Sequence, residues 1–268
     1  METIMSNWLN QTMDAFPAKS ALYWVDLTTG KPLAAIRENT KVVSASTIKL
    51  PVLCCALQGV LDGDYNLEQF IPISEGDFCD DTHVFEPEYR QDGATLWEML
   101  YWMIVSSDNT ATNAVLSLLT FDRINAYCAS LGLQQTSAHR KMLDFEAVKA
   151  GRNNYTSPAD QYRVYKLLYD GAILTPELRE VAFDFLSRVR HLDGLQRYLP
   201  QKVTVLHKPG GLDHLNHDAG IFLVEGKPYY LGVFTWDGPA LDGDPDQVRL
   251  IGKLSRAIYD YTVKGVTP

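Results

Sequence analysis

The chain has 268 residues, of which 46% are hydrophobic and 11% aromatic, enough to bury a large core in one or two globular lobes. Its formal net charge of −9 excludes the basic face that nucleic acids and anionic membranes require, so we expect neither as a partner. No stretch approaches the roughly 18 uncharged apolar residues that span a bilayer, and residues 1–16 lack the pattern of a secretory leader. We therefore expect a cytoplasmic protein.

The first predicted element is a β-hairpin. Two apolar runs, residues 21–25 and 32–36, flank the turn-forming residues Thr28-Thr29-Gly30-Lys31. From residue 46 to about 199, apolar residues mostly recur at three- and four-residue spacing, which predicts helices. The clearest helical patterns cover 96–105 and 158–169.

The C-terminal part returns to strands, which are predicted over 203–207, 220–224 and 229–236. Asp244-Pro245 then predicts the start of a last helix. The apolar residues on one face of that helix are Val248, Ile251, Leu254 and Ile258. We therefore expect an α+β fold, with a five-stranded antiparallel sheet flanked by helices in a discontinuous domain of residues 1–45 and 200–268, and an all-helical domain of residues 46–199.

The four cysteines are predicted to be buried, reduced thiols. Cys54 and Cys55 are adjacent on a predicted helix and cannot easily bridge each other. The sequence contains no Cys-x-x-Cys pair that would suggest a metal site. We expect no metal and no organic cofactor.

Ser46-Thr47-Ile48-Lys49 places a hydroxyl and an amine at i and i+3, on one face of a helix. A serine hydroxyl is a poor nucleophile at neutral pH and needs a base within hydrogen-bond reach. Lys49 can accept the Ser46 proton only as the free base, so its pKa has to be lowered by burial or by a second cation such as Lys208. Taken alone, the motif also fits a capped helix with a solvated lysine.

Two further motifs follow in order, Ser107-Asp108-Asn109 and His207-Lys208-Pro209-Gly210-Gly211. Their order and spacing match the pattern of penicillin-recognising serine enzymes. From about Ala21 to its C-terminus, the chain resembles the class A β-lactamase group of the penicillin-binding serine hydrolase family. Weaker matches in the same order are 95–100, Tyr155-Thr156-Ser157-Pro158 and His217-Asp218-Ala219-Gly220.

The resemblance implies an active site in the cleft between the two domains, with Ser46 as nucleophile at a helix N-terminus. Lys49 would be the base for acylation, and Ser107 would pass a proton to the leaving nitrogen. Lys208 would order Ser107 and attract a substrate carboxylate.

The resemblance also implies the groups that hold the substrate. The backbone N–H groups of Ser46 and Gly211 would stabilise the developing oxyanion. Asn109 would hold the substrate amide and the Lys49 head, whereas Asp108 is expected to be structural. The implied substrate-binding residues are Asn109, Gly210, Gly211 and His217.

The chain departs from the family at the base for deacylation. The family activates its hydrolytic water with a glutamate about 17 residues before the Ser157-Pro158 position. Counting back reaches Lys141-Met142, and the nearest carboxylates are Asp144 and Glu146. Three alternatives follow. One of these two carboxylates reaches the site, with Glu146 the candidate catalytic residue. Otherwise Lys49 serves as base for both acylation and deacylation, or the acyl-enzyme is long-lived. General-base help is worth about 10²–10⁴ in rate, so its loss predicts slow deacylation.

A second departure is Pro209, where the family usually has a threonine or serine. Proline offers neither hydroxyl nor N–H, which predicts weaker binding of a carboxylated β-lactam. A protonated His217 would compensate in part; otherwise it is a structural residue.

The leading hypothesis is a monomeric serine hydrolase that acts on a small-molecule acyl substrate through a Ser46 acyl-enzyme. β-Lactamase-type hydrolysis of a β-lactam or related cyclic amide is the activity that the resemblance implies. The alternatives are a cytoplasmic esterase, amidase or peptidase of the same family, and a penicillin-binding module that is acylated without turnover.

Overall fold

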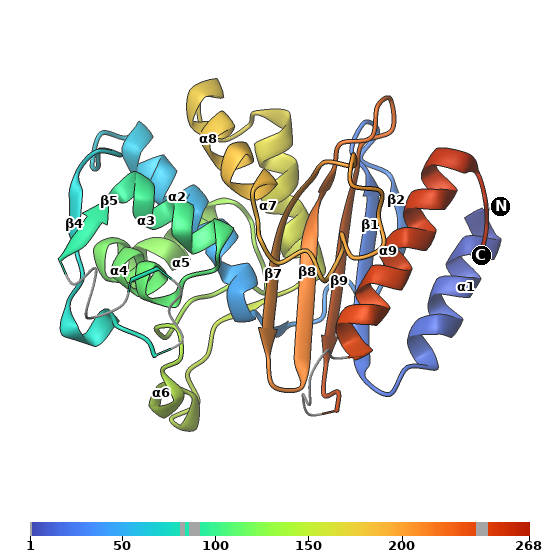
Figure 1. Ribbon diagram of the computed structural model, residues 1–268, viewed down its shortest axis with the longest axis horizontal. Coiled ribbons are helices and arrows are strands. Elements are labelled where there is room, and N and C mark those ends of the chain that lie inside the picture. The colour runs from blue at the N-terminus through green and yellow to red at the C-terminus, as the bar shows by residue number, and fades with distance from the viewer. Residues whose placement is uncertain (1, 81–83, 86–91, 240–245) are drawn as a thin grey trace. The chain divides into compact units, whose positions relative to one another are not determined.

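The computed structural model describes residues 2–80, 84–85, 92–239 and 246–268 (Figure 1). They divide into two compact units. Unit 1 comprises Met1–Thr47, Thr156–Lys166 and His191–Pro268, and unit 2 comprises Ile48–Tyr155 and Leu167–Arg190. This division differs from the predicted one in assigning residues 46–47, 156–166 and 191–199 to the unit that holds the sheet.

A five-stranded antiparallel sheet forms the centre of unit 1, which confirms the predicted sheet. Its strands are β1 (Lys19–Asp26), β2 (Pro32–Ile36), β7 (Val205–Leu212), β8 (Leu215–Phe222) and β9 (Tyr229–Trp236). Their spatial order is β2-β1-β9-β8-β7, so β7 lies at one edge (Figure 1). The predicted hairpin is β1 and β2, and β1 pairs with β9 along its whole length.

β7 and β8 extend beyond the predicted strands. β7 continues to Leu212, so the Lys208 motif lies inside the strand instead of after it. Proline and glycine are unfavourable in a strand, which is why the sequence pattern stopped at residue 207, but an edge strand tolerates them. A two-residue turn then leads into β8, and His214 in this turn has a φ of +66°.

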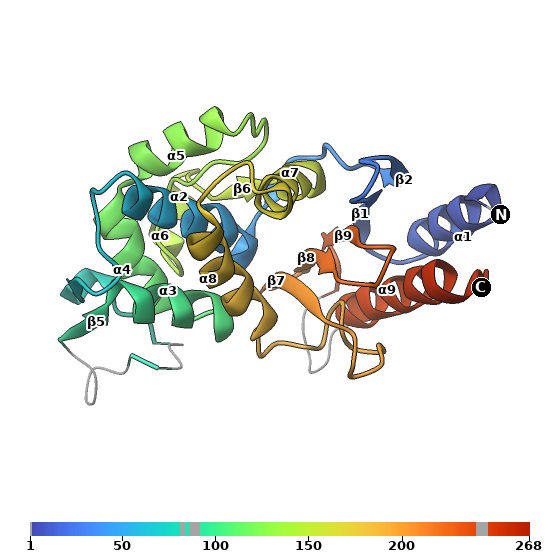
Figure 2. The same ribbon diagram turned by 90° about the horizontal axis from the view of Figure 1, so that it is seen from above.

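Helices cover both faces of the sheet in unit 1. The helices α1 (Glu2–Asp14) and α9 (Asp246–Lys264) lie side by side on one face (Figure 2). On the other face, Tyr165 in the first part of α7 (Pro158–Asp170) donates a hydrogen bond to the Ala219 carbonyl oxygen at 2.8 Å. Tyr230 of β9 donates to the Pro158 carbonyl oxygen, also at 2.8 Å. These two bonds explain why residues 156–166 belong with the sheet.

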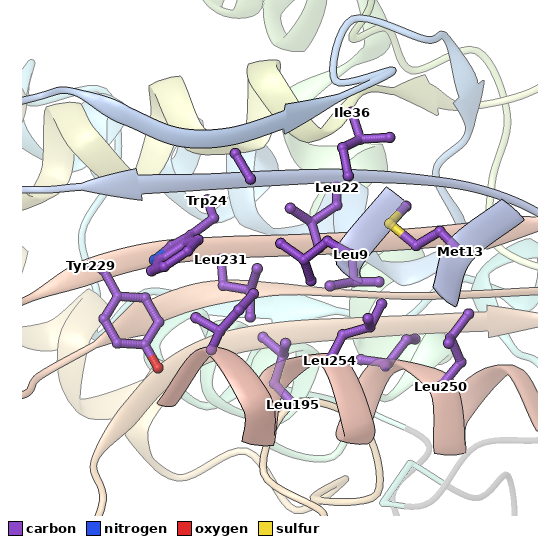
Figure 3. Packing of buried hydrophobic residues seen from close by; sticks show 14 of the residues in the cluster. Leu9, Met13, Leu22, Trp24, Ile36, Leu195, Tyr229, Leu231, Leu250 and Leu254 are labelled. Atoms are coloured by element: carbon purple, nitrogen blue, oxygen red, sulfur yellow. The ribbon is translucent and has the colours of Figure 1, made fainter. Parts of the chain in front are cut away.

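The core of unit 1 lies between the sheet and the pair α1 and α9 (Figure 3). All four apolar residues predicted on one face of α9 are buried. Leu9 and Met13 of α1 join the same cluster, although the sequence pattern did not predict this helix. The predicted helix start at Asp244-Pro245 lies outside the described residues.

Unit 2 is mainly helical, as predicted. Its elements are α2 (Lys49–Leu61), α3 (Leu96–Val105), α4 (Asn109–Leu119), α5 (Phe121–Ser130), α6 (Phe145–Lys149), α8 (Pro176–Ser187), the 3-10 helix η2 (Glu75–Asp77) and the short strands β4 (Phe70–Pro72) and β5 (Gly93–Thr95). The antiparallel pair β4 and β5 was not predicted. Three short elements lie at or beside the boundary between the units: β3 (Val42–Val43), the 3-10 helix η1 (Ala45–Ile48) and β6 (Tyr155–Thr156).

Helix α2 is the centre of unit 2, because it contacts α3, α4, α5 and α8. It is apolar on almost every side, as a helix surrounded by others must be. The polar residue among its buried side chains is Lys49, the first residue of the helix, which is fully buried. A buried amine needs hydrogen-bond acceptors within the protein, so polar partners are required at the start of α2.

All four cysteines are buried thiols outside any disulfide, as predicted. Burial raises the pKa of the Cys55 thiol to about 11, so it stays protonated. Among the described helices, none is both long and apolar enough to cross a membrane. No group of three or more histidine, cysteine, aspartate or glutamate side chains is placed to hold a metal ion in the described part of the chain.

The core of unit 1 generates a stability prediction. Replacing Leu254, which is fully buried, with alanine leaves a cavity and is expected to lower the free energy of unfolding by about 2–5 kcal/mol. Val263→Ala on the exposed side of the same helix is the control, expected to change it by less than about 0.5 kcal/mol. Urea denaturation followed by tryptophan fluorescence measures both; equal effects would contradict the packing described here.

Candidate active site

Ser46 lies in η1, which continues directly into α2. Side chains at i and i+3 eclipse one another in a 3-10 turn, so Ser46 and Lys49 project from the same side of this segment. Ala45, immediately before Ser46, has a φ of +44°. This left-handed conformation costs a residue with a side chain about 1–3 kcal/mol and is found preferentially at functional sites.

The Lys49 ammonium group is held by three oxygen atoms of unit 2. Its Nζ lies 2.7 Å from the Ser107 carbonyl oxygen, 3.0 Å from Ser107 Oγ and 2.8 Å from Asn109 Oδ1. Three acceptors match the three hydrogens of an ammonium group. Two of these oxygens can only accept, whereas the Ser107 hydroxyl can also donate. Among these three oxygens, the Ser107 hydroxyl is therefore the one through which a proton on Lys49 can move on.

The turn between α3 and α4 places Ser107 and Asn109 against Lys49. Ser107 has a φ of +59°, a second left-handed residue in the motifs. Asp108 is the N-cap of α4, because its Oδ1 accepts a hydrogen bond from the Ala111 backbone N–H at 2.8 Å. Its other oxygen accepts from the Val84 N–H at 2.9 Å. Asp108 thus has the structural position that the sequence predicted.

In unit 1, β7 passes very close to the backbone of η1. A Cβ atom at Gly210 would lie 2.7 Å from the Ser46 backbone N and 2.9 Å from the Thr47 backbone N. Both distances are shorter than real Cβ contacts, so only glycine permits this approach. Gly211 follows on the same edge strand and is exposed. Because alternate N–H groups of an edge strand point away from its neighbour, this part of β7 can offer a donor next to Ser46.

Lys208 lies on the same face of β7 as Gly210, since strand residues two apart share a face. Its side chain is fully buried, and its Nζ donates to the Pro209 carbonyl oxygen at 3.0 Å. Burial lowers the pKa of Lys208 to about 7, although the negative charge of Asp218 opposes this shift. Pro209 has its ring on the opposite face of the strand.

Asp218 belongs to a buried pair that the sequence motifs did not predict. Its carboxylate lies 2.9 Å from His207 Nδ1 and accepts a hydrogen bond from the Leu195 backbone N–H, also at 2.9 Å. Both side chains are almost completely buried. The sequence placed each residue in a motif but gave no signal that they meet, which depends on the β7–β8 register.

His217 shares a face with Gly210, its partner in the sheet, but its ring is a neutral structural group. Its Nε2 lies 2.9 Å from the Val43 carbonyl oxygen, and its Nδ1 accepts from the Thr235 backbone N–H at 3.3 Å. Burial lowers its pKa to about 4. Of the two alternatives given for His217, these contacts favour the structural residue.

The loop position counted back from Ser157-Pro158 holds a buried methionine. The Met142 backbone N–H donates to Asn113 Oδ1 at 2.7 Å, and Asn113 Nδ2 donates to the Met142 carbonyl oxygen at 3.4 Å. The preceding Lys141 forms an ion pair of 2.6 Å with the buried carboxylate of Asp77. The loop is therefore tied to α4 through Met142 and to η2 through Lys141, the two residues that the count reached.

The two nearby carboxylates have other partners. Glu146 is 82% exposed, and its Oε1 pairs with Lys149 at 2.6 Å. Asp144 is the N-cap of α6, with its Oδ1 accepting from the Ala147 N–H at 2.9 Å. Glu146 thus lies at the surface in an ion pair with Lys149. This geometry does not favour the predicted catalytic role of Glu146.

The buried Lys208 generates a pH prediction. Lysine has a pKa of 10.5 when unperturbed and about 7 here, so between these values the unfolded chain binds more protons and stability rises with pH. Lys208→Met keeps the apolar stem and removes the ammonium. We expect its stability advantage over the parent protein to be largest at or below pH 7 and to shrink toward about pH 10. Urea denaturation at several pH values measures the difference, and a constant difference would contradict the shifted pKa.

Comparisons with known proteins identify relatives of this chain. The sequence profile of the beta-lactamase enzyme family matches residues 5–262. Beta-lactamase FAR-1 of Nocardia farcinica (strain IFM 10152) is 29% identical over 253 residues, which are 91% of this chain and 78% of FAR-1.

Two solved structures share the fold. A point mutant of PBP-A, determined as an acyl-enzyme complex with penicillin G, has a TM-score of 0.88 and 24% identity over 96% of both chains. A representative of class A beta-lactamase from Bacteroides cellulosilyticus DSM 14838 has a TM-score of 0.87 and 19% identity over 99% of both chains. The resemblance seen in the motifs is therefore confirmed, and the chain belongs to the beta-lactamase enzyme family as a class A beta-lactamase-like member.

Proposed function

We propose that this protein is a serine hydrolase that opens β-lactams or related cyclic amides through a Ser46 acyl-enzyme, with deacylation as the slow step. The main support for the proposal is the environment of Lys49. Its amine is buried, lies one turn after Ser46 in a continuous helical segment and is bound by both Ser107 and Asn109. Membership of the family and the similarity to FAR-1 support the same chemistry.

Acylation would begin with Lys49 as the free amine. The two hydrogens of the free amine would bind the two oxygens that can only accept, the Ser107 carbonyl oxygen and Asn109 Oδ1. The lone pair of Lys49 Nζ is then left to accept the Ser46 proton. Ser46 Oγ attacks the carbonyl carbon as Lys49 takes this proton. The amide C–N bond then breaks. Lys49 returns the proton through Ser107 Oγ, whose own hydrogen passes to the leaving nitrogen.

The negative charge that develops on the carbonyl oxygen would be bound by the N–H groups of Ser46 and Gly211. The close approach of Gly210 to the Ser46 backbone supports this pairing. Each donor of this kind is worth about 10²–10³ in rate. Lys208 would attract a substrate carboxylate, and because its pKa is about 7, this attraction weakens as the pH rises above neutrality.

Deacylation needs a water molecule and a base, and the count back to the family's glutamate reaches Lys141-Met142, where no carboxylate stands. Lys49 is then the remaining candidate for the base. A slow second step favours one alternative, a penicillin-binding protein that is acylated and turns over little. Pro209, which brings no hydroxyl for a carboxylate, favours a different acyl substrate such as an ester or a peptide.

Covalent capture of a β-lactam is the first prediction from this proposal. Incubation with penicillin G is expected to add the mass of the intact antibiotic to the protein, with the adduct persisting for minutes or longer. Ser46→Ala is expected to abolish the adduct, while Ser44→Ala, two residues earlier in the chain, serves as the matched control. Intact-mass spectrometry over time, with product formation followed in parallel, makes the measurement.

The outcomes separate the candidate functions. A slowly disappearing adduct with stoichiometric product supports the proposal, and a permanent adduct supports the penicillin-binding alternative. Rapid turnover without an adduct would mean that deacylation has an efficient base after all. Absence of both adduct and product would contradict action on β-lactams and direct the search to esters and peptides.

Restoring a carboxylate at the loop position is the second prediction. Met142→Glu has nearly the same side-chain length, and burial would raise the pKa of the new carboxyl group toward that of a general base. We expect the adduct lifetime to shorten by a factor of about 10²–10⁴. Met142→Gln has the same shape but no base, and it is expected to leave the lifetime almost unchanged. Equal lifetimes of the two variants would contradict the assignment of this position.

A further inference from the structure

Asp218 places a carboxylate at the edge of the hydrophobic core of unit 1. Its side chain is 1% exposed. It lies on the face of the sheet that carries the core, because Val233 and Leu22, which follow it across the strands, both belong to that core (Figure 3). Taking a carboxylate out of water is costly, and apolar side chains in place of a buried ion pair are often as stable or more so. Core stability alone therefore does not explain an aspartate at this position.

The groups around Asp218 hold it as an anion. Its carboxylate accepts hydrogen bonds from the Leu195 backbone N–H and from His207 Nδ1, each at 2.9 Å. Gln196 Nε2 lies 2.9 Å from His207 Nε2, and because an amide nitrogen only donates, His207 accepts there and carries its proton on Nδ1. A Cβ atom at Gly194 would overlap Asp218 Oδ2, so the chain leaves room for the carboxylate. The pair of His207 and Asp218 is therefore built to keep one negative charge.

Lys208 lies on the other side of the same pair of strands. Asp218 is paired with Pro209, the residue after Lys208, and side chains alternate along a strand, so Lys208 and Asp218 point to opposite faces. Both side chains are buried. Burial lowers the pKa of Lys208 to about 7, and the negative charge of Asp218 opposes this shift. The sheet thus has a buried cation on one face with a buried anion behind it.

The face of Lys208 carries other titratable groups. His217 of β8 is neutral near pH 7, because burial lowers its pKa to about 4. Asp160 of α7 is a buried carboxylate whose negative charge acts on Tyr230. Tyrosine hydroxyls, which are neutral near pH 7, complete this set: Tyr23, Tyr162, Tyr165 and Tyr230.

We propose that Asp218 is a positioning residue for Lys208, a counter-charge behind the strand that keeps the Lys208 side chain a cation for an anionic substrate. The inference rests on the proposed function, in which Lys208 attracts a substrate carboxylate. A carboxylate on the same face would form an ion pair with Lys208 and compete with the substrate. Asp218 acts across the strand through its electric field, which is stronger in a poorly solvated interior than in water, and does not occupy the face of Lys208.

Neutralising Asp218 tests this role. Asp218→Asn keeps the shape of the side chain and an acceptor for the Leu195 N–H, but it removes the charge. The pKa of Lys208 is expected to fall by roughly one pH unit, the size of a charge interaction at an effective dielectric constant of about 20. The measurement is an NMR titration of the Lys208 ¹³Cε signal in protein made with ¹³C-labelled lysine. Lys208→Met identifies this signal by its absence.

Two further variants make the titration decisive. Asp160→Asn removes the charge of another buried carboxylate of unit 1 and is the matched control, expected to leave the pKa of Lys208 nearly unchanged. The double variant His207→Gln with Asp218→Asn replaces the pair by two amides that can bond each other, so it serves if Asp218→Asn alone does not fold. It is expected to lower the pKa of Lys208 as Asp218→Asn does. Thermal unfolding confirms that each variant is folded.

Capture of penicillin G, whose carboxylate Lys208 would attract, gives a second measurement. At pH 7, Asp218→Asn is expected to form the adduct up to about fivefold more slowly than the parent protein, because a smaller fraction of Lys208 is charged. Near pH 5 the two rates are expected to be almost equal, because Lys208 is charged in both proteins. A merely structural role of Asp218 would slow the reaction equally at both pH values.

Two results would overturn the proposal. The Lys208 signal could titrate at the same pH in the parent protein and in the folded Asp218 variants, which would mean that Asp218 is not its counter-charge. Asp160→Asn could lower the pKa of Lys208 as much as Asp218→Asn does, which would mean that the position of the charge is unimportant. If the parent protein captures no penicillin G, the proposed function fails instead, and the Lys208 titration still decides the role of Asp218.

Discussion

The burial of one amine constrains much of unit 2. Lys49 begins the central helix of that unit and has no contact with solvent, so its hydrogens must be accepted by the protein. The acceptors come from the turn between α3 and α4, where Ser107 takes a left-handed conformation and Asp108 caps the following helix. The strain in this turn and the geometry around Lys49 are therefore parts of one arrangement.

A second buried lysine has a different electrostatic character. Burial lowers the pKa of Lys208, and the negative charge of Asp218 opposes this shift. Asp218 is itself bound to His207. One lysine is thus stabilised by directed oxygen atoms, and the other titrates near neutrality. In an acyl-transfer enzyme, Lys49 would move a proton, whereas Lys208 would attract a substrate anion.

Much of the fold followed from the sequence because its signals are local. Three elements each have an apolar repeat that lies within one short segment of the sequence: the hairpin of β1 and β2, helix α3 and the buried face of α9. The contact between Asn109 and Lys49 was implied by the resemblance to the family, which the three motifs carry. Features that depend on tertiary packing were not predictable: α1 is ordered by packing on the sheet, and the contacts of Met142 and His217 arise from distant segments.

The pairing of β1 with β9 has a consequence for biosynthesis. Lys19 lies opposite Trp236, so the central pair of the sheet joins the first strand of the chain to its last. A ribosome releases β1 long before β9 exists, whereas every helix of unit 2 is complete by then. Until β9 has been made, β1 and β2 form a two-stranded hairpin with an unpaired edge, which is marginal in water and prone to aggregation. Chains cut short before residue 229 would lose the sheet as a whole while keeping the sequence of unit 2 intact.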